Sequence, residues 1–329
     1  MDKIVGLGNA LVDVLAALEN DTPLKEMELP KGSMQLVDED KLRQINDNLA
    51  KMETHLASGG SAANTIMGLA CLGATTGFIG KVGHDRYGDF FRQHLGRNHI
   101  DDKLLASPSL PSGVASTFIS PDGERTFGTY LGAAATLEAN DLTPAMFEGY
   151  TYLYIEGYLV QNHDMILRAL HLAKAAGLRV CLDLASYNIV AADRDFFGLL
   201  VDRYVDILFA NEEEARAFTG QEPLEALARL AARCDIAVVK VGAAGSYASR
   251  AGQTVHADAI PVPKVIDTTG AGDYFAAGFL YALIHGHPLR QCAEVGALLS
   301  GNVIQVVGTT MTAERWTEIK LNIKAILAE

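Results

Sequence analysis

Asp267-Thr-Thr-Gly-Ala-Gly-Asp273 precedes the apolar run YFAAGFLYALIHG, and together they indicate a tight turn that opens a buried helix. Gly270 and Gly272 lack side chains, so the backbone can turn sharply and leave its N–H groups exposed. Those N–H groups and the positive end of the helix dipole suit a phosphoryl group. Asp273 follows in the first turn, where a carboxylate can take a proton from an attacking hydroxyl. A simple helix cap is the alternative interpretation of the same residues.

Apolar runs alternate with helical segments along most of the rest of the chain. Strands are predicted over residues 4–8, 76–82, 152–155, 179–183, 207–210 and 236–241, and helices over 61–72, 163–176, 193–204, 212–219, 271–285, 289–306 and 312–327. Repeated strand–helix–strand order implies a mainly parallel sheet with helices on both faces. The sequence therefore predicts a Rossmann-like α/β fold in a single domain, residues 1–329.

Two segments depart from this alternation and predict a separate small sheet. Short alternating strands flank Pro121-Asp-Gly-Glu124, which is a good hairpin turn. We expect residues of approximately 14–37 and 104–135 to form a β-sheet lid over the α/β body. Within it, strand alternation places Phe127, Thr129 and Leu131 on one face, suited to covering a flat base or a sugar.

The composition excludes several classes of protein. The 329 residues are 49% hydrophobic and carry a formal net charge of −13, which argues against disorder and against binding to a nucleic-acid backbone. No apolar run approaches the roughly 18 to 20 residues of a membrane-spanning helix. Four scattered cysteines and the lack of a basic N-terminal stretch favour the cytoplasm, with no membrane or nucleic-acid partner.

Other polar residues fall where the predicted strands meet helices. In Ser58-Gly-Gly-Ser-Ala-Ala-Asn64, Gly59 and Gly60 permit close approach of a ligand, and Asn64 projects toward the same helix start. A helix cap with small packing residues is the alternative. Asp13 interrupts an apolar run and needs a partner, either a pair of ligand hydroxyls or a backbone amide.

Asn211-Glu-Glu-Glu214 follows the predicted strand 207–210, at the strand end where α/β folds place ligands. An N-cap asparagine with acidic residues in the first turn is sufficient to explain this pattern. The functional interpretation is that Asn211 and Glu214 order water around Mg²⁺ beside nucleotide phosphates.

The order of these motifs resembles the PfkB (ribokinase-like) family of carbohydrate and nucleoside kinases. The resemblance implies a ribokinase-like fold with a β lid, and ATP-dependent phosphorylation of a primary hydroxyl with Mg²⁺. It further implies a monovalent cation such as K⁺ near Asp267 and Thr269. By this resemblance Asp273 is the catalytic base and Gly270, Ala271 and Gly272 form the anion hole; Asn9, Asp13, Gly59, Gly60 and Asn64 bind the acceptor; Asn211 and Glu214 hold the metal through water; and Asn211, Lys240, Gly242, Gly245, Thr268 and Asn302 flank the nucleotide.

Within the family, the chain is most similar to bacterial adenosine kinases. Asn9 and Asp13 match their N-x-x-x-D spacing, and the segment with Phe127 and Leu131 resembles their lid strand. Tyr158 and Tyr187, each after a predicted strand, are predicted to sandwich a purine. A core or hairpin role for these lid and aromatic residues is the alternative.

Two other functions compete with a nucleoside kinase. A sugar kinase of the ribokinase or fructokinase type would use the same catalytic motif, because Asp13 and its neighbours do not contact the base. A non-catalytic nucleoside sensor would bind without producing ADP, but it would have no use for Asp273. The expected partners are ATP and a small nucleoside or sugar, and the sequence does not distinguish a monomer from a homodimer.

Overall fold

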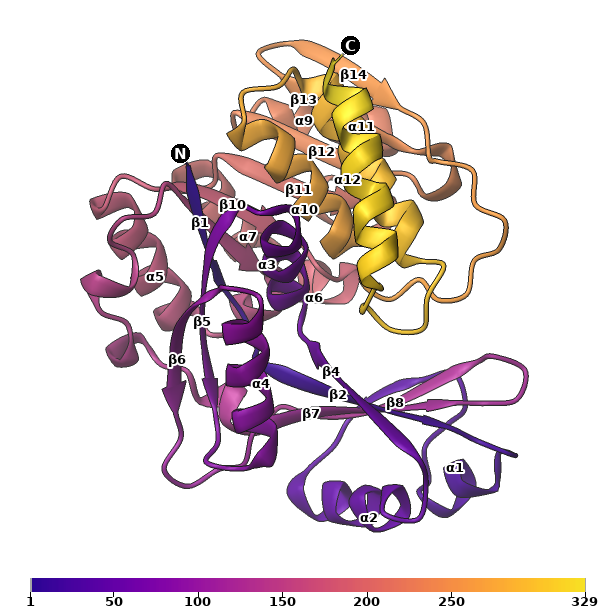
Figure 1. Cartoon of the computed structure of the whole chain (residues 1–329). Coiled ribbons are helices and arrows are strands. Elements are labelled where there is room, and N and C mark those ends of the chain that lie inside the picture. The colour runs from indigo at the N-terminus through magenta and orange to yellow at the C-terminus, as the bar shows by residue number, and fades with distance from the viewer. Residues whose placement is uncertain (1, 329) are drawn as a thin grey trace.

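The computed structural model describes residues 2–328 and contains a nine-stranded main sheet and a five-stranded small sheet (Figure 1). Across the main sheet the strands are β14 (Gln253–Ala257), β13 (Ser246–Arg250), β12 (Ile236–Lys240), β11 (Ile207–Asn211), β10 (Arg179–Asp183), β9 (Tyr152–Glu156), β1 (Lys3–Leu7), β5 (Thr75–Val82) and β6 (Asp101–Ala106). All neighbouring pairs from β12 to β6 are parallel, and β13 and β14 are antiparallel. The predicted mainly parallel sheet is confirmed.

Helices cover both faces of the main sheet, each over its own apolar core. One face carries α3 (Ser61–Leu72), α4 (Arg86–Arg97), α10 (Ala271–Ile284), α11 (Leu289–Val303) and α12 (Ala313–Ala328), and the other carries α5 (His163–Ala175), α6 (Tyr187–Ala192), α7 (Arg194–Arg203), α8 (Glu212–Thr219) and α9 (Pro223–Ala231). The central strands are buried on both faces because helices pack on each side, which explains their continuous apolar sequences.

The small sheet lies beside the main body and has helices on its outer face (Figure 1). Its strands, in order, are β3 (Met34–Leu36), β8 (Arg125–Tyr130), β7 (Gly113–Ile119), β2 (Leu11–Ala17) and β4 (Thr54–Gly59), and its helices are α1 (Thr22–Glu26) and α2 (Glu39–Leu49). The expected bounds of 14–37 and 104–135 therefore need correction. They omit β4, whose sequence THLASG lacks apolar alternation, and they include residues 104–106 of β6, which pair with β5 in the main sheet.

Four neighbouring parallel strands place polar side chains at one edge of the main sheet. β9, β10, β11 and β12 end in Glu156, Asp183, Asn211 and Lys240. Strand register aligns Glu156 with Asp183 and Asn211 with Lys240. In an α/β fold the carboxyl ends of the strands are where ligands bind. In the described residues 2–328, no helix is both long and apolar enough to cross a membrane.

Candidate active site

A cavity of about 1410 Å³ runs between this polar strand edge, the turn before α10 and the inner face of the small sheet. It brings together most residues singled out in the sequence. Those that line it are Asn9, Asp13, Gly60, Asn64, Phe127, Leu131, Tyr158, Asn211, Glu214, Lys240, Gly242, Gly245, Thr268, Gly270, Ala271, Gly272 and Asp273. Residues more than 250 positions apart in sequence thus line the same cavity.

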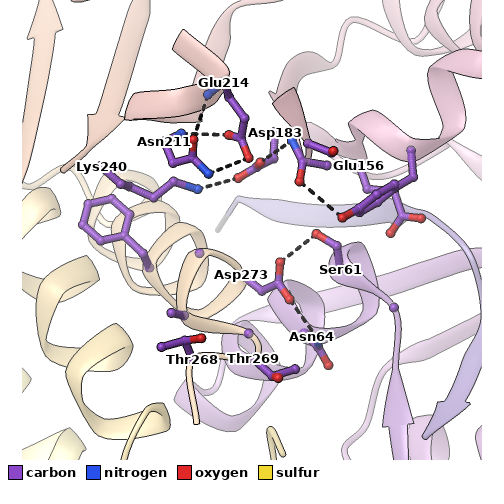
Figure 2. Close-up of a pocket in the computed structure, with 18 of the residues that line it drawn as sticks. Ser61, Asn64, Glu156, Asp183, Asn211, Glu214, Lys240, Thr268, Thr269 and Asp273 are labelled. Atoms are coloured by element: carbon purple, nitrogen blue, oxygen red, sulfur yellow. Dashed lines mark hydrogen bonds and ion pairs between the residues drawn. The ribbon is translucent and has the colours of Figure 1, made fainter. Parts of the chain in front are cut away.

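Asp273 is held in the cavity by side chains from α3 (Figure 2). Its Oδ1 accepts a hydrogen bond from the Ser61 hydroxyl at 2.7 Å, and its Oδ2 accepts one from the Asn64 amide at 2.9 Å. Thr309 in turn donates to the Asn64 carbonyl oxygen at 3.3 Å, which fixes the direction of that amide. Burial raises the pKa of Asp273 to about 6, although the bonds from Ser61 and Asn64 lower it. A carboxylate with this pKa is ionised at neutral pH and can accept a proton.

The turn before α10 has the conformation that its glycines predict. Gly270 is the N-cap and adopts φ 75°, in the left-handed region that favours glycine. The Ala271 amide donates to the Thr268 carbonyl oxygen at 3.2 Å, so this amide is used within the turn. Within the described residues, the amides of Gly270 and Gly272 have no such acceptor. They are the groups available to an anion at this helix start.

The strand ends opposite this turn carry acidic, amide and basic side chains that bond one another. The Lys240 ammonium donates to Asp183 Oδ2 at 2.9 Å. The Asn211 side chain accepts from the Glu214 amide at 2.8 Å, while Glu214 accepts from both nitrogens of Asn211, at 2.7 and 2.8 Å. The helix-cap interpretation of Asn211 and Glu214 is therefore confirmed, and the same two residues also line the cavity.

These residues fit a divalent cation that is held mainly by water and phosphate. Asp183, Glu214 and Asp273 surround the single ammonium of Lys240, which leaves an excess of negative charge. Burial and the repulsion of Asp183 raise the pKa of Glu214 to about 7. Among residues 2–328, no three His, Cys, Asp or Glu side chains are close enough to coordinate an ion directly. Asn211 and Glu214 are thus suited to an outer shell, because carboxylate and amide oxygens bind metal-bound water well.

Asn9 and Gly60 lie at the junction between the main sheet and the small sheet. A β-carbon on Gly60 would come within 2.2 Å of the Asn9 carbonyl oxygen, and Gly60 itself adopts φ 97°. Glu156 accepts from the Asn9 backbone and side-chain nitrogens at 2.9 and 2.6 Å, and from the Ala62 amide at 2.8 Å. The Glu156 carboxylate thus connects the segment after β1 to the first turn of α3, the helix from which Asn64 donates to Asp273.

Asp13 lies on β2 and faces the cavity. Burial raises the pKa of Asp13 to about 7, although nearby Arg125 lowers it. Gly59 does not line the cavity. A β-carbon on Gly59 would lie 2.4 Å from Asp13 Oδ1, so this glycine leaves room for the carboxylate. Its predicted contact with a ligand stays a prediction.

The inner face of the small sheet closes one end of the cavity. Phe127, Thr129 and Leu131 all line it, which confirms their predicted alternation. Tyr158 lines it as well and donates to the Ala185 carbonyl oxygen at 3.3 Å. Tyr187 begins α6, is 48% exposed and lies outside the cavity lining. Of the two tyrosines predicted to sandwich a purine, only Tyr158 therefore lines the cavity.

Arg125 of the small sheet forms an ion pair with Asp267, 2.7 Å between Nη1 and Oδ2. Asp267 also accepts from the amides of Thr269 and Gly308, at 3.0 and 2.7 Å. The Asp267 side chain is only 2% exposed. Because Arg125 belongs to β8 and Asp267 to the turn before α10, this buried ion pair links the small sheet to that turn. The guanidinium balances the charge of the Asp267 carboxylate, and the K⁺ that the resemblance implies near Asp267 and Thr269 stays a prediction.

An apolar slot lies at the opposite end of the cavity from the small sheet. It is lined by Ile260, Pro261, Val262, Val265, Ala297 and Ile304. Asn302, predicted to flank the nucleotide, lies outside the lining because its amide donates to the Leu298 carbonyl oxygen of α11 at 2.8 Å. Ser300 and Gly301 of the same helix take that place.

Sequence reasoning missed Glu156 and Asp183 as site residues. Asp183 ends the predicted strand 179–183, and Glu156 comes directly after the predicted strand 152–155. Each is a charged residue that closes an otherwise apolar run, and each is at most 4% exposed. Because burial of a carboxylate is costly without a partner, an acid at the carboxyl end of a buried strand was the available signal. Ser61 and Arg125 were also missed.

Comparisons with known proteins agree with this arrangement. A family model described as pfkB family carbohydrate kinase matches residues 33–316. A probable sugar kinase from Rhizobium etli CFN 42 has a similar structure, with a TM-score of 0.86 and 32% identity over 98% of both chains. The adenosine kinase from Sinorhizobium meliloti has a TM-score of 0.85 and 33% identity, over 98% of this chain and 99% of that one. Adenosine kinase 1 from Arabidopsis thaliana is 25% identical over 332 residues, 93% of this chain and 95% of the relative.

Proposed function

The chain belongs to the pfkB family of carbohydrate kinases, and on that premise we propose that it transfers the γ-phosphoryl group of ATP to the 5′-hydroxyl of adenosine or a closely related nucleoside. Membership makes it a phosphotransferase with a hydroxyl acceptor and a ribokinase-like α/β fold. The observation that carries the proposal is the Asp273 carboxylate, held by Ser61 and Asn64 between a polar strand edge and an apolar sheet face.

Asp273 acts as the general base in the proposed reaction. It removes the proton from the acceptor hydroxyl as the hydroxyl oxygen attacks the γ-phosphorus. The bond to the β–γ bridging oxygen breaks, and ADP leaves with the electron pair. The amides of Gly270 and Gly272 at the start of α10 stabilise the charge on the transferring group. Ser61 and Asn64 keep the carboxylate in line with the hydroxyl, and positioning of this kind supplies much of the catalysis in phosphoryl transfer.

The nucleotide extends from the turn before α10 toward the apolar slot. Gly242, Gly245 and Thr268 border its path, and Ile260 and Ile304 flank the place of its base. Mg²⁺, when bound, neutralises phosphate charge. Asn211 and Glu214 would hold it through water, as their places in the cavity and the local excess of negative charge favour.

The distribution of polarity in the acceptor end favours a nucleoside over a free sugar. Polar side chains gather near Asp273, where Asn9, Asp13 and Asn64 suit the hydroxyls of a ribose. Farther away the lining is apolar, with Leu11, Met34, Leu36, Ala115, Phe127, Leu131, Leu137 and Leu159. Met34 and Leu36 are 56% and 67% exposed, so a flat base placed over them would remove apolar surface from water. A sugar presents hydroxyls on all its edges and would leave them unpaired against this surface.

A sugar acceptor is the second candidate because of one similarity. The probable sugar kinase from Rhizobium etli is as similar to this chain in structure as the adenosine kinase from Sinorhizobium meliloti. Asp13, on the cavity wall, is suited to a sugar hydroxyl in either case.

Thermal stabilisation across an acceptor panel tests the proposal. The purified protein is melted alone and with adenosine, inosine, ribose or fructose, each at the same concentration, and again with a non-hydrolysable ATP analogue present. We expect adenosine to raise the melting temperature more than either free sugar does, because only adenosine covers the apolar face. Stabilisation by ribose or fructose but not by nucleosides would refute the nucleoside assignment and favour the sugar kinase.

A further inference from the structure

Asp183 is a buried acid at the site that the transfer described above does not use. It ends β10 and is 4% exposed. Its Oδ1 accepts from the Ala185 amide at 2.9 Å, and its Oδ2 accepts from the Lys240 ammonium at 2.9 Å. Both oxygens are engaged by the protein, so Asp183 is anchored in place. It can therefore orient a neighbour more readily than it can bind a substrate.

Lys240 is the neighbour that Asp183 orients. It ends β12, and its Nζ lies 3.0 Å from the place that a β-carbon on Gly272 would occupy. The ammonium thus lies directly against the second residue of α10, beside the helix start whose free amides suit an anion. Figure 2 shows the Lys240 side chain directed toward Asp183. The Lys240 side chain is 15% exposed and lines the cavity. Of the three N–H donors of an ammonium, one bonds Asp183 within the described residues.

The charges around Lys240 keep it protonated. Burial lowers the pKa of Lys240, but Asp183, Glu214 and Asp273 together raise it above its usual value. A permanent cation beside the Gly270–Gly272 turn attracts a phosphoryl group that carries several negative charges. A lysine side chain is flexible, so its ammonium must be anchored if it is to meet that group without losing rotamer freedom.

We propose that Asp183 is a positioning residue that fixes the Lys240 ammonium against the phosphoryl group being transferred, at the Gly270–Gly272 turn. The inference rests on the proposed use of ATP. It gives Lys240 a role at the reacting group itself, in addition to its place beside the nucleotide. No covalent bond to Lys240 forms. The ammonium donates hydrogen bonds to phosphate oxygens while the acceptor oxygen attacks and ADP leaves, and the proton goes to Asp273.

Three variants test this pair: Lys240→Met, Asp183→Asn and the two together. Each is titrated with β,γ-imido-ATP and with adenosine, and is assayed for ADP release. We expect Lys240→Met to weaken binding of the analogue about tenfold to a hundredfold, the usual range for a charge-assisted hydrogen bond, with adenosine affinity unchanged. Asp183→Asn should lower kcat about tenfold and leave the KM for adenosine unchanged. If Asp183 acts through Lys240, the double variant should be no worse than Lys240→Met.

The Lys174–Asp206 ion pair gives a matched control. These residues line a separate surface cleft, and Lys174→Met should leave analogue affinity and kcat at wild-type values. Lys240→Met leaves three acids without their cation and could fail to fold. The double variant keeps the net charge of the site. If Lys240→Met does not fold, analogue affinity and kcat of the double variant are compared with those of Asp183→Asn.

Two results would overturn the inference. One is wild-type analogue affinity and kcat in Lys240→Met or in the double variant. The other is a double variant whose loss is the product of the two single losses, because Asp183 would then act independently of Lys240. Failure of the wild type to phosphorylate adenosine would refute the acceptor assignment instead, and the analogue titration would still decide the role of Lys240.

Discussion

Replacement of Asp273 by asparagine separates the proposed chemistry from the fold. The asparagine can keep both hydrogen-bond partners, with its oxygen toward the Asn64 amide and its amide toward the Ser61 hydroxyl, which can turn to accept. The geometry of the cavity should therefore survive. What disappears is the basic oxygen, so turnover should fall about 10²-fold to 10⁴-fold, the range for loss of a general base.

The pKa of Asp273 gives the expected effect on stability. Burial raises it from 3.8 to about 6, so ionisation of Asp273 at pH values above 6 costs the folded state about 3 kcal/mol relative to the unfolded chain. Asp273→Asn removes this cost and should be at least as stable as wild type at about pH 8. Near about pH 5 the folded wild type holds the proton, and the advantage should shrink.

The assay measures ADP release at saturating ATP and adenosine, with urea unfolding at both pH values alongside it. Asp258→Asn serves as the control, because that side chain is 95% exposed and its loss should change neither quantity. Near wild-type turnover in Asp273→Asn would refute the assignment of the base. A large loss of stability in Asp273→Asn at about pH 8 would refute the raised pKa of Asp273. The loss of turnover would then reflect unfolding rather than the missing base.

Three further predictions follow from charges in and around the cavity. Because Asp273 must be ionised to act, kcat/KM for the acceptor should fall about tenfold for each unit of pH below about 6, and a flat profile from about pH 5 to 8 would contradict this. Burial raises the pKa of Glu156 from 4.5 to about 7, so this residue should make the free energy of unfolding decrease by about 3 kcal/mol as the pH rises from 4.5 to about 7. Glu156→Gln should flatten the pH dependence of the free energy of unfolding measured in urea. An unchanged pH dependence in Glu156→Gln would contradict the raised pKa. Arg125→Met leaves the buried Asp267 carboxylate unpaired and should cost about 3 kcal/mol of stability, against under about 1 kcal/mol for the exposed Arg43→Met; equal losses would show that the Arg125 pair is unimportant.

Local sequence was sufficient for the features that a single segment determines. The turn before α10 depends on its own glycines and on the apolar helix that follows, so Asp273 could be placed in the first turn without knowledge of its neighbours. The inner face of β8 was predictable for the same reason, because alternation along one strand puts Phe127 and Thr129 on one side.

Features that depend on neighbouring strands were beyond local sequence. The contact between Asp183 and Lys240 can be predicted only once β10 and β12 are known to lie on either side of β11. The edge strands β6 and β14 were missed, and so was β13 beside β14, because all three are short and partly polar. Tyr187 followed a predicted strand, but the direction of α6 takes it out of the cavity lining.

Identification of the phosphorylated product tests the central claim most directly. The wild-type protein is incubated with ATP, Mg²⁺ and an equimolar mixture of adenosine, ribose and fructose, and the products are separated and located by phosphorus NMR. The account predicts that adenosine is consumed first and that its product carries the phosphate on the 5′-oxygen. Phosphorylation of ribose or fructose with adenosine untouched would contradict it.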